Sequence, residues 1–136
     1  QVALRKAQNF LDAGALVHII APQLHPDVLA LYKEKKITWD KKRIEKKDIR
    51  QAALIVSATD EREVNEAVSR WAGEKGIRIN VVDQPRISDF ISPAVIREGK
   101  ALVAVYTDGR DPVLSRDLKN FLKENWNDFL SYRDRS

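Results

Sequence analysis

The amino-acid sequence predicts an α/β fold: a parallel sheet with helices on both faces, extended by an antiparallel hairpin and a C-terminal helix. Short, continuously apolar runs at residues 16–21, 53–59 and 77–82 alternate with segments of helical periodicity, as in parallel sheets that are buried on both faces. Later in the chain, two apolar runs at residues 90–96 and 101–106 are separated by four residues that include a glycine. This spacing is typical of an antiparallel hairpin.

The first predicted elements are a helix, a strand, a second helix and a short strand. Apolar residues recur at helical spacing over residues 2–13, and Gly14 follows where a left-handed cap is expected. Residues 16–21 form a β-branched run that predicts a buried parallel strand. A proline in the first turn suits a helix over residues 26–35, and residues 37–39 are a predicted short strand.

A strand–helix–strand unit is predicted next, after a brief helical turn that Asp48 can cap. Residues 53–59 form a second continuously apolar strand. Residues 61–73 place their apolar side chains at the spacing i, i+3, i+4, i+7 and i+8, which predicts an amphipathic helix packed on the sheet. A third strand follows at residues 77–82, and this order of elements is typical of right-handed βαβ units.

The C-terminal segment carries one apolar stripe of helical spacing that begins at Pro112 and continues for about five turns. Two interpretations remain open, because the stripe is broad and aromatic. It either packs into the core of the chain or forms a contact between two copies. The residues of the stripe are Leu114, Leu118, Phe121, Leu122, Trp126, Phe129 and Leu130.

Composition excludes several classes of protein and site. The chain of 136 residues is the size of one domain, and its 43% hydrophobic and 32% charged residues are ordinary for a globular protein. It has no cysteine, which excludes disulfides, thiolate metal sites and a cysteine nucleophile. With His18 and His25 as the only histidines, no metal site is expected. No apolar run approaches the roughly 20 residues that span a bilayer, so we expect a cytoplasmic protein without membrane contact.

The formal net charge of +4 is concentrated between Lys33 and Lys47, where eight lysines and arginines face three acidic residues. A nucleic-acid surface is one interpretation. However, only Tyr32 and Trp39 are interleaved with these cations, and no base-reading motif accompanies them. A solvated charged face is therefore favoured and no nucleic-acid partner is expected, although attraction of a small polyanion stays open.

The candidate ligand site lies at the carboxyl ends of the predicted strands, where open parallel sheets bind their ligands. Dinucleotide binding also needs a glycine-rich turn that leads into a helix. The printed sequence starts within the first helix, so we expect a strand and a glycine turn before it, and poor NAD binding without them. The strand ends carry Ala21 and Pro22; Ser57, Ala58, Thr59 and Asp60; and Asp83.

Four blocks of sequence resemble one family in family order. They are residues 2–7 and 11–15 with the Ala-Pro pair at 21–22; residues 57–60 with Val64 and Asn65; residues 80–85 with 89–90 and 93–94; and Gly109 with residues 111–116. Together they resemble the precorrin-2 dehydrogenase and sirohydrochlorin ferrochelatase family, which forms the N-terminal module of siroheme synthases.

The resemblance implies a Rossmann-like NAD-binding domain over residues 1–106 and the start of a helical dimerisation region at residues 107–136. It implies a homodimeric oxidoreductase of siroheme (porphyrin) biosynthesis that removes two hydrogens from precorrin-2 to give sirohydrochlorin, sometimes followed by iron insertion. By the same resemblance Asp83 is the catalytic acid–base residue. The residues that line NAD are Ala21, Pro22, Ser57, Ala58, Thr59 and Asp60.

Alternatives remain for the residues and for the function. Asp83 can cap the turn before Pro85, and Asp60 can cap the helix that follows it. A family member that binds a nucleotide or tetrapyrrole without catalysis is the second hypothesis. A basic nucleic-acid module is the third, and it predicts binding that weakens steeply with salt.

Overall fold

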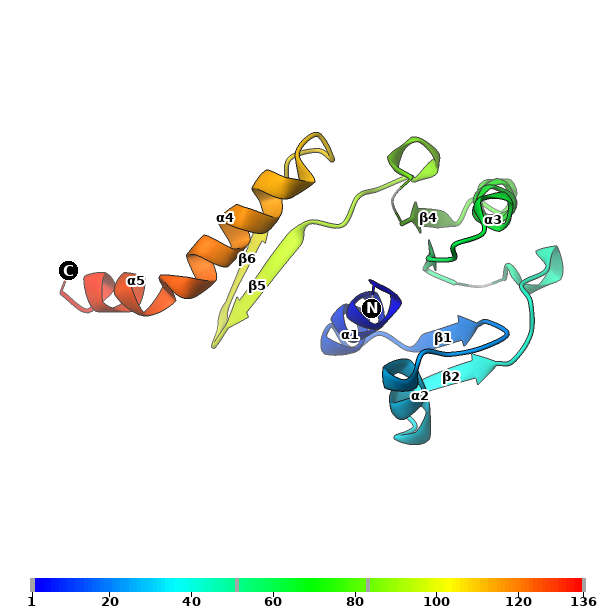
Figure 1. Ribbon diagram of the computed structural model, residues 1–136, viewed down its shortest axis with the longest axis horizontal. Coiled ribbons are helices and arrows are strands. Elements are labelled where there is room, and N and C mark those ends of the chain that lie inside the picture. The colour runs from blue at the N-terminus through cyan, green and yellow to red at the C-terminus, as the bar shows by residue number, and fades with distance from the viewer. Residues whose placement is uncertain (1, 51, 83, 136) are drawn as a thin grey trace. The chain divides into compact units, whose positions relative to one another are not determined.

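The computed structural model describes residues 2–50, 52–82 and 84–135. The chain divides into two compact units, Gln1–Val82 and Asp83–Ser136, and Figure 1 labels most of the helices and strands of each. The first unit holds parallel strands and the second an antiparallel hairpin, which confirms the predicted α/β class. The predicted division after residue 106 comes from the family resemblance and stays a prediction.

The first parallel pair forms where the sequence predicts it. Its elements are helix α1 (Val2–Asp12), strand β1 (Val17–Ile20), helix α2 (Pro26–Lys33) and strand β2 (Ile37–Asp40). Gly14 follows α1 with a φ of +78°, which is the left-handed conformation predicted for the cap. The two strands pair in parallel over four residues each.

An apolar core stabilises this pair from one side. Ala7, Val28, Leu31 and Ile37 are each at most 7% exposed, and burial of an aliphatic side chain of this kind contributes about 1.5–3 kcal/mol. The partly buried residues packed against them are Leu4, Leu11, Val17, Ile19 and Leu24. Because side chains alternate along a strand, the other face of the pair carries His18, Thr38 and Asp40.

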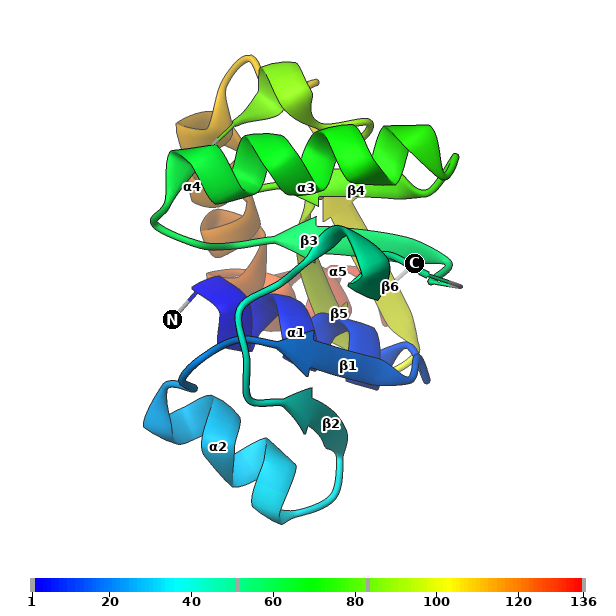
Figure 2. The ribbon, with the colours of Figure 1, turned by 90° about the vertical axis from the view of Figure 1, so that its right-hand side faces the viewer.

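The second parallel pair consists of strand β3 (Leu54–Ser57) and strand β4 (Arg78–Val81), which helix α3 (Arg62–Glu74) connects. Figure 2 shows α3 lying along this pair and α2 lying beside the β1–β2 pair. Val68 and Ala72 of α3 are at most 4% exposed. Their burial confirms the predicted apolar face of this helix.

The pairs β1–β2 and β3–β4 are separate two-stranded sheets in the part of the chain that the structure describes. The parallel alignment is confirmed within each pair, whereas the sequence predicted one continuous sheet. Side-chain contacts link the two pairs instead: Lys6–Asn80 at 2.9 Å, Arg43–Glu61 at 3.0 Å and Lys46–Glu74 at 2.6 Å.

At two predicted helix caps the structure differs from the sequence prediction. Asp48 stabilises the brief 3-10 turn at residues 46–48, but from its last position, where its carboxylate accepts a backbone N–H from the start of the turn over 2.9 Å. The cap position of α3 is occupied by Glu61, so the prediction for Asp60 is wrong. The reason is a local turn, because the Glu61 N–H donates to the Thr59 hydroxyl over 3.2 Å.

The second unit begins with a 3-10 turn (Pro85–Ile87) and then forms the predicted hairpin from strands β5 (Ala94–Glu98) and β6 (Ala101–Val105). The hairpin is tighter than predicted, because Glu98 pairs with Ala101 and only two residues form its turn. Gly99 takes the first turn position with a φ of +57°, as two-residue hairpin turns require.

The predicted C-terminal stripe is divided between helix α4 (Pro112–Glu124) and helix α5 (Trp126–Arg133). Asn125 separates them, and its side-chain amide donates to the Phe121 carbonyl over 2.8 Å. Asp111 caps α4 by accepting the Leu114 N–H over 2.7 Å. The large apolar side chains left exposed on these helices are Val113, Leu114, Leu118, Phe121, Phe129 and Tyr132.

Among the described residues, no helix combines the length and the apolarity that crossing a lipid bilayer requires.

Candidate functional site

The loop that follows β3 is held by a buried polar network centred on Asn65 of α3. The Ser57 hydroxyl donates to Asn65 Oδ1 over 2.7 Å, and the Asn65 side-chain amide donates to the Thr59 carbonyl over 3.0 Å. Thr59 Oγ1 lies 3.0 Å from Asn65 Oδ1 as well. Asn65 is 2% exposed and Ser57 is 5% exposed, so the network is shielded from water and fixes the path of the loop.

This network decides how the predicted cofactor-lining residues can act. The hydroxyls of Ser57 and Thr59 both contact Asn65 Oδ1, and Ser57 is buried whereas Thr59 is exposed. Ala58 and Asp60 are exposed beside them. A ligand at this strand end would therefore meet the backbone of the loop and the Asp60 carboxylate, a surface whose shape is set by Asn65.

The role of Asn65 could have been found in the sequence by its spacing. Asn65, Val68 and Ala72 lie at positions i, i+3 and i+7, and all three are buried. A polar residue at such a position must be hydrogen-bonded, because an unpaired buried amide costs about 1–3 kcal/mol. The family resemblance included Asn65 in a block but gave it no role.

At the end of β1, both polar backbone groups of Ala21 are already used. Its N–H donates to the Asp40 carbonyl over 3.2 Å, and its carbonyl accepts the indole N–H of Trp39 over 2.9 Å. Pro22 is exposed and has no N–H. These two residues therefore have no free backbone N–H to donate to a ligand, and the indole of Trp39 hydrogen-bonds to the exit of the strand.

The ends of β3 and β4 lie side by side. Ser57 pairs with Val81, and the Val82 N–H donates to the Ser57 carbonyl over 2.9 Å. Asp83, the predicted catalytic residue, comes next in the chain but lies outside the described residues. The structure thus brings together the Ser57–Asp60 loop and the segment that leads to Asp83, while Ala21 and Pro22 belong to the other strand pair.

Lys6 is a second residue at this end of the sheet that the sequence did not single out. Its half-buried ammonium donates to Asn80 Oδ1 over 2.9 Å, and Asn80 is 5% exposed. Asn80 precedes the last residue of β4. A buried asparagine in an apolar strand was the available signal, but nothing in the sequence paired it with a lysine 74 positions away.

The basic segment is mostly paired with carboxylates. Five of its eight cations form ion pairs: Lys36–Glu34, Lys42–Asp48, Arg43–Glu61, Lys46–Glu74 and Lys47–Glu45. The hydrogen bond from Lys42 and the backbone N–H of Glu45 lower the pKa of the Asp48 carboxyl. This pairing supports the interpretation as a solvated charged face.

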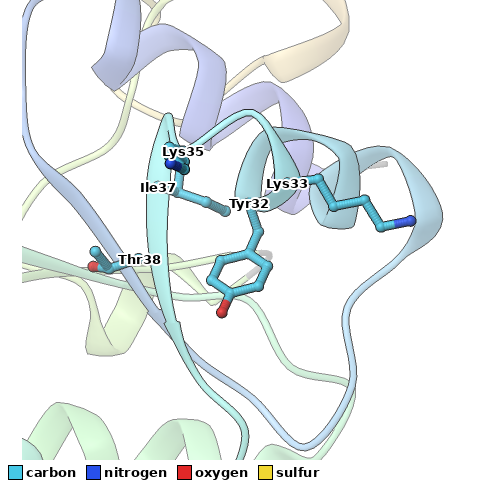
Figure 3. Close-up of a pocket in the computed structure, with 5 residues that line it drawn as sticks. All are labelled: Tyr32, Lys33, Lys35, Ile37 and Thr38. Carbon is cyan, nitrogen blue, oxygen red and sulfur yellow. The ribbon is translucent and has the colours of Figure 1, made fainter.

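A hollow of about 400 Å³ lies beside β2 and is lined by Tyr32, Lys33, Lys35, Ile37 and Thr38 (Figure 3). Ile37 and Thr38 are the first two residues of β2, so the hollow lies away from the carboxyl end of that strand. Figure 3 shows Thr38 leaving the strand on one side and the ring of Tyr32 lying on the other. The hollow therefore lies at the start of β2 and shares no residue with the candidate site.

The histidines have local partners. His18 Nδ1 lies 2.8 Å from the Thr38 hydroxyl, and its Nε2 lies 3.5 Å from the Asp40 carboxylate. His25 Nδ1 lies 3.3 Å from the Asp27 carboxylate. Within residues 2–50, 52–82 and 84–135, no three potential metal ligands gather in one place.

Comparison with known proteins identifies the chain. Residues 1–94 match the family described as "Putative NAD(P)-binding". The chain belongs to this family. The family description supports a nicotinamide cofactor and does not separate NAD from NADP.

Individual relatives agree with this assignment. The chain is 41% identical over 123 residues to siroheme synthase 1 of Aeromonas salmonicida (strain A449), covering 90% of the chain and 26% of that protein. It is 44% identical over 119 residues to the siroheme synthase of Methylococcus capsulatus (strain ATCC 33009 / NCIMB 11132 / Bath), covering 88% of the chain and 25% of that protein. The chain thus spans about a quarter of the length of these relatives.

A solved structure supports the fold. The precorrin-2 dehydrogenase SirC superposes with a TM-score of 0.76 at 24% sequence identity, over 92% of this chain and 61% of that chain. This agreement confirms a Rossmann-like arrangement of the strands and helices.

Proposed function

We propose that this protein carries out the NAD-dependent dehydrogenation of precorrin-2 to sirohydrochlorin in siroheme biosynthesis. The observation that carries the proposal is the similarity to siroheme synthases, 41% and 44% identity over about nine-tenths of the chain. The precorrin-2 dehydrogenase with the same fold supports the same reaction. The loop after β3 supports it physically, because hydrogen bonds to the buried Asn65 side chain hold its conformation.

The described residues fit a nicotinamide cofactor at the strand ends. When bound, NAD supplies an acceptor for a hydride. Ala58, Thr59 and Asp60 would face it through their backbone, with Asn65 as the residue that positions this loop, while Ala21 and Pro22 would offer apolar contact. NAD is the cofactor proposed for the reaction, while residues 21–25 contain neither an acidic residue for the ribose of NAD nor an arginine or lysine for the 2′-phosphate of NADP.

The proton that accompanies hydride removal needs an acceptor at the same site. Asp83 is the proposed acceptor, because it follows the strand whose end lies beside Ser57 and because a carboxylate can serve as a general base. Asn80 of β4 lies close to it in the sequence and accepts a hydrogen bond from the Lys6 ammonium over 2.9 Å.

The same proposal includes a homodimer formed through the second unit. Leu114, Leu118 and Phe121 of α4 are between 41% and 59% exposed, and a continuous apolar face of this kind is typical of an interface. Phe121→Glu should convert a dimer of the intact protein to a monomer in analytical ultracentrifugation. An unchanged sedimentation coefficient would contradict the dimer.

The decisive experiment mixes the intact purified protein with precorrin-2 and NAD and follows the absorbance of sirohydrochlorin and of NADH. Equal amounts of both products are expected. Binding of NAD and tetrapyrrole without turnover would instead support a non-catalytic member of the family. Addition of ferrous iron to the product mixture tests the chelatase step, which would replace the sirohydrochlorin spectrum with that of siroheme.

A further inference from the structure

Three cations of the basic segment differ from the other five. Lys33, Lys35 and Lys41 form no ion pair within the part of the chain that the structure describes, whereas each of the others contacts a carboxylate. Lys33 and Lys35 precede β2, and Lys41 follows its last residue. The lysines of this segment that no carboxylate pairs therefore lie at the two ends of one strand.

β2 also has one edge that no other strand occupies among the described residues, because it pairs with β1 alone. The Asp40 carbonyl accepts the Ala21 N–H, so Asp40 and, two residues earlier, Thr38 direct their backbone groups toward β1. Successive residues of a strand direct these groups to opposite sides. The N–H and the carbonyl of Trp39 therefore point to the open edge, as in other edge strands.

The hollow at the start of β2 adds an apolar surface beside these charges. Its lining includes Lys33, Lys35 and Tyr32 (Figure 3). Tyr32 is 42% exposed, and its ring meets the Trp39 ring edge-on at a centroid distance of 5.5 Å. Because the second ring holds the first, little side-chain freedom is lost when a ligand packs on Tyr32.

The spacing of the three lysines favours one kind of ligand. β2 has four residues, which span about 10–13 Å in an extended strand, so a ligand that matches both ends is itself extended. An acidic peptide is extended, and its main chain offers both a donor and an acceptor to Trp39. The phosphates of a nucleic acid offer acceptors alone, which do not complement the Trp39 carbonyl.

We propose that β2 and its flanking lysines form a docking surface for an extended acidic segment of a partner protein. The segment pairs with the open edge at Trp39, its carboxylates contact Lys33, Lys35 and Lys41, and an apolar side chain packs on Tyr32 in the hollow. This surface contains none of the residues predicted to line the cofactor, so the inference is independent of the proposed function.

The test uses a short fluorescein-labelled peptide of alternating glutamate and valine, titrated with the intact protein at physiological salt and followed by fluorescence anisotropy. The combined substitution Lys33→Gln, Lys35→Gln and Lys41→Gln should weaken binding about tenfold, because three exposed ion pairs each contribute a fewfold. A peptide in which proline replaces every valine should bind at least as weakly, since proline has no N–H to donate. Absence of binding by the first peptide would instead indicate lysines that keep other strands away from the edge.

A second combined variant is the matched control. Arg43→Gln, Lys46→Gln and Lys47→Gln remove the same formal charge from cations that carboxylates already pair, so peptide affinity should change less than about twofold. Equal losses in the two combined variants would show attraction by net charge alone and overturn the inference. Tighter binding of a single-stranded oligothymidylate through the same three lysines would overturn it in favour of a nucleic-acid surface.

Amide hydrogen exchange followed by NMR tests the strand pairing directly. In the free protein the Trp39 amide should exchange fast and the Thr38 amide slowly, because only Thr38 directs its N–H toward β1. Saturation with the glutamate–valine peptide should slow exchange at Trp39 and leave Thr38 unchanged. A Trp39 amide that is already protected in the free protein, or that the peptide leaves unprotected, would contradict pairing at this edge.

Discussion

The two parallel strand pairs of the first unit are built from the same elements but bury different groups. The β1–β2 pair rests on an apolar core that includes Val28, Leu31 and Ile37, whereas the buried polar residues described in this unit, Ser57, Asn65 and Asn80, all belong to the β3–β4 pair and α3. Burying a polar side chain is costly unless it is hydrogen-bonded, and no buried polar side-chain atom among the described residues is without a partner. The comparison teaches that one pair contributes stability, while the other also fixes the shape of a site.

The largest expected effect concerns Asp83, which follows the β3–β4 pair in the sequence. Asp83→Asn keeps the size of the side chain but removes its ability to accept a proton. Loss of a general acid or base typically lowers the rate by about 10²- to 10⁴-fold, so sirohydrochlorin formation should fall by that factor. The melting temperature should change little, since asparagine caps turns about as well as aspartate.

The measurement also decides between the two roles predicted for Asp83. Turnover within a fewfold of the unsubstituted enzyme, with an unchanged melt, would leave Asp83 as a turn cap. The family resemblance would then lack its central residue.

Ile37→Ala, in the β1–β2 pair, should cause a large loss of protein stability and a small change in ligand affinity. Ile37 is 4% exposed, and truncation of a buried isoleucine to alanine costs about 2–5 kcal/mol. Urea denaturation measures the loss, and NADH titration of the folded variant measures the affinity. Thr38→Ala, on the other face of the same strand, is the control. A tenfold loss of NADH affinity in Ile37→Ala would contradict the proposal that the β1–β2 pair contributes stability while the β3–β4 pair also shapes the site.

Asn65→Ala should show the opposite pattern, a smaller loss of stability and a larger loss of ligand affinity. It leaves the buried hydroxyl of Ser57 without its acceptor, which costs about 1–3 kcal/mol, and it releases the loop that carries Thr59. NADH affinity should therefore fall even where the variant is fully folded. Asn120→Ala, at an exposed position of α4, controls for the substitution itself. An intact NADH affinity in Asn65→Ala would show that the loop needs no support from α3.

Local sequence signals predicted most of the elements. Gly14, Pro26 and Pro112 mark helix ends where the structure has them, because glycine and proline restrict the backbone independently of distant contacts. The continuous apolar runs likewise located β1, β3 and β4. The loop after β3 and the approach to Asp83 were predicted as part of the site, and the structure places these two segments side by side.

Interactions between distant residues were not predictable in the same way. The contact between Lys6 and Asn80 joins residues 74 positions apart in the sequence, and neither residue specifies it locally. The break at Asn125 was missed because the apolar stripe continues across it; at the break the Phe121 carbonyl accepts both the backbone N–H and the side-chain amide of Asn125. The cap at Glu61 was missed because it depends on a side-chain hydrogen bond, in which the Thr59 hydroxyl accepts the Glu61 N–H.

The smallest expected effect compares one backbone motif that occurs in both strand pairs. After α2, the Lys36 N–H donates to the Leu31 carbonyl over 3.0 Å and Lys35 has a φ of +58°. After α3, Ile77 and Gly76 form the same left-handed ending, with a φ of +65° at the glycine. The left-handed conformation costs a residue with a side chain about 1–2 kcal/mol, and glycine recovers this at a cost of about 0.4–1 kcal/mol in unfolded-state entropy.

Lys35→Gly should therefore stabilise the protein by up to about 1 kcal/mol in urea denaturation. The substitution also removes one of the two lysines that line the hollow beside β2. Gly76→Ala should destabilise it by a similar amount, since an added Cβ at Gly76 meets no atom within 4 Å and only the backbone conformation opposes it. If Lys35→Gly destabilises the protein while Gly76→Ala behaves as expected, the Lys35 side chain contributes more to the β1–β2 pair than its strained backbone costs. The hollow that Lys35 lines would then be the place to look for the interaction responsible.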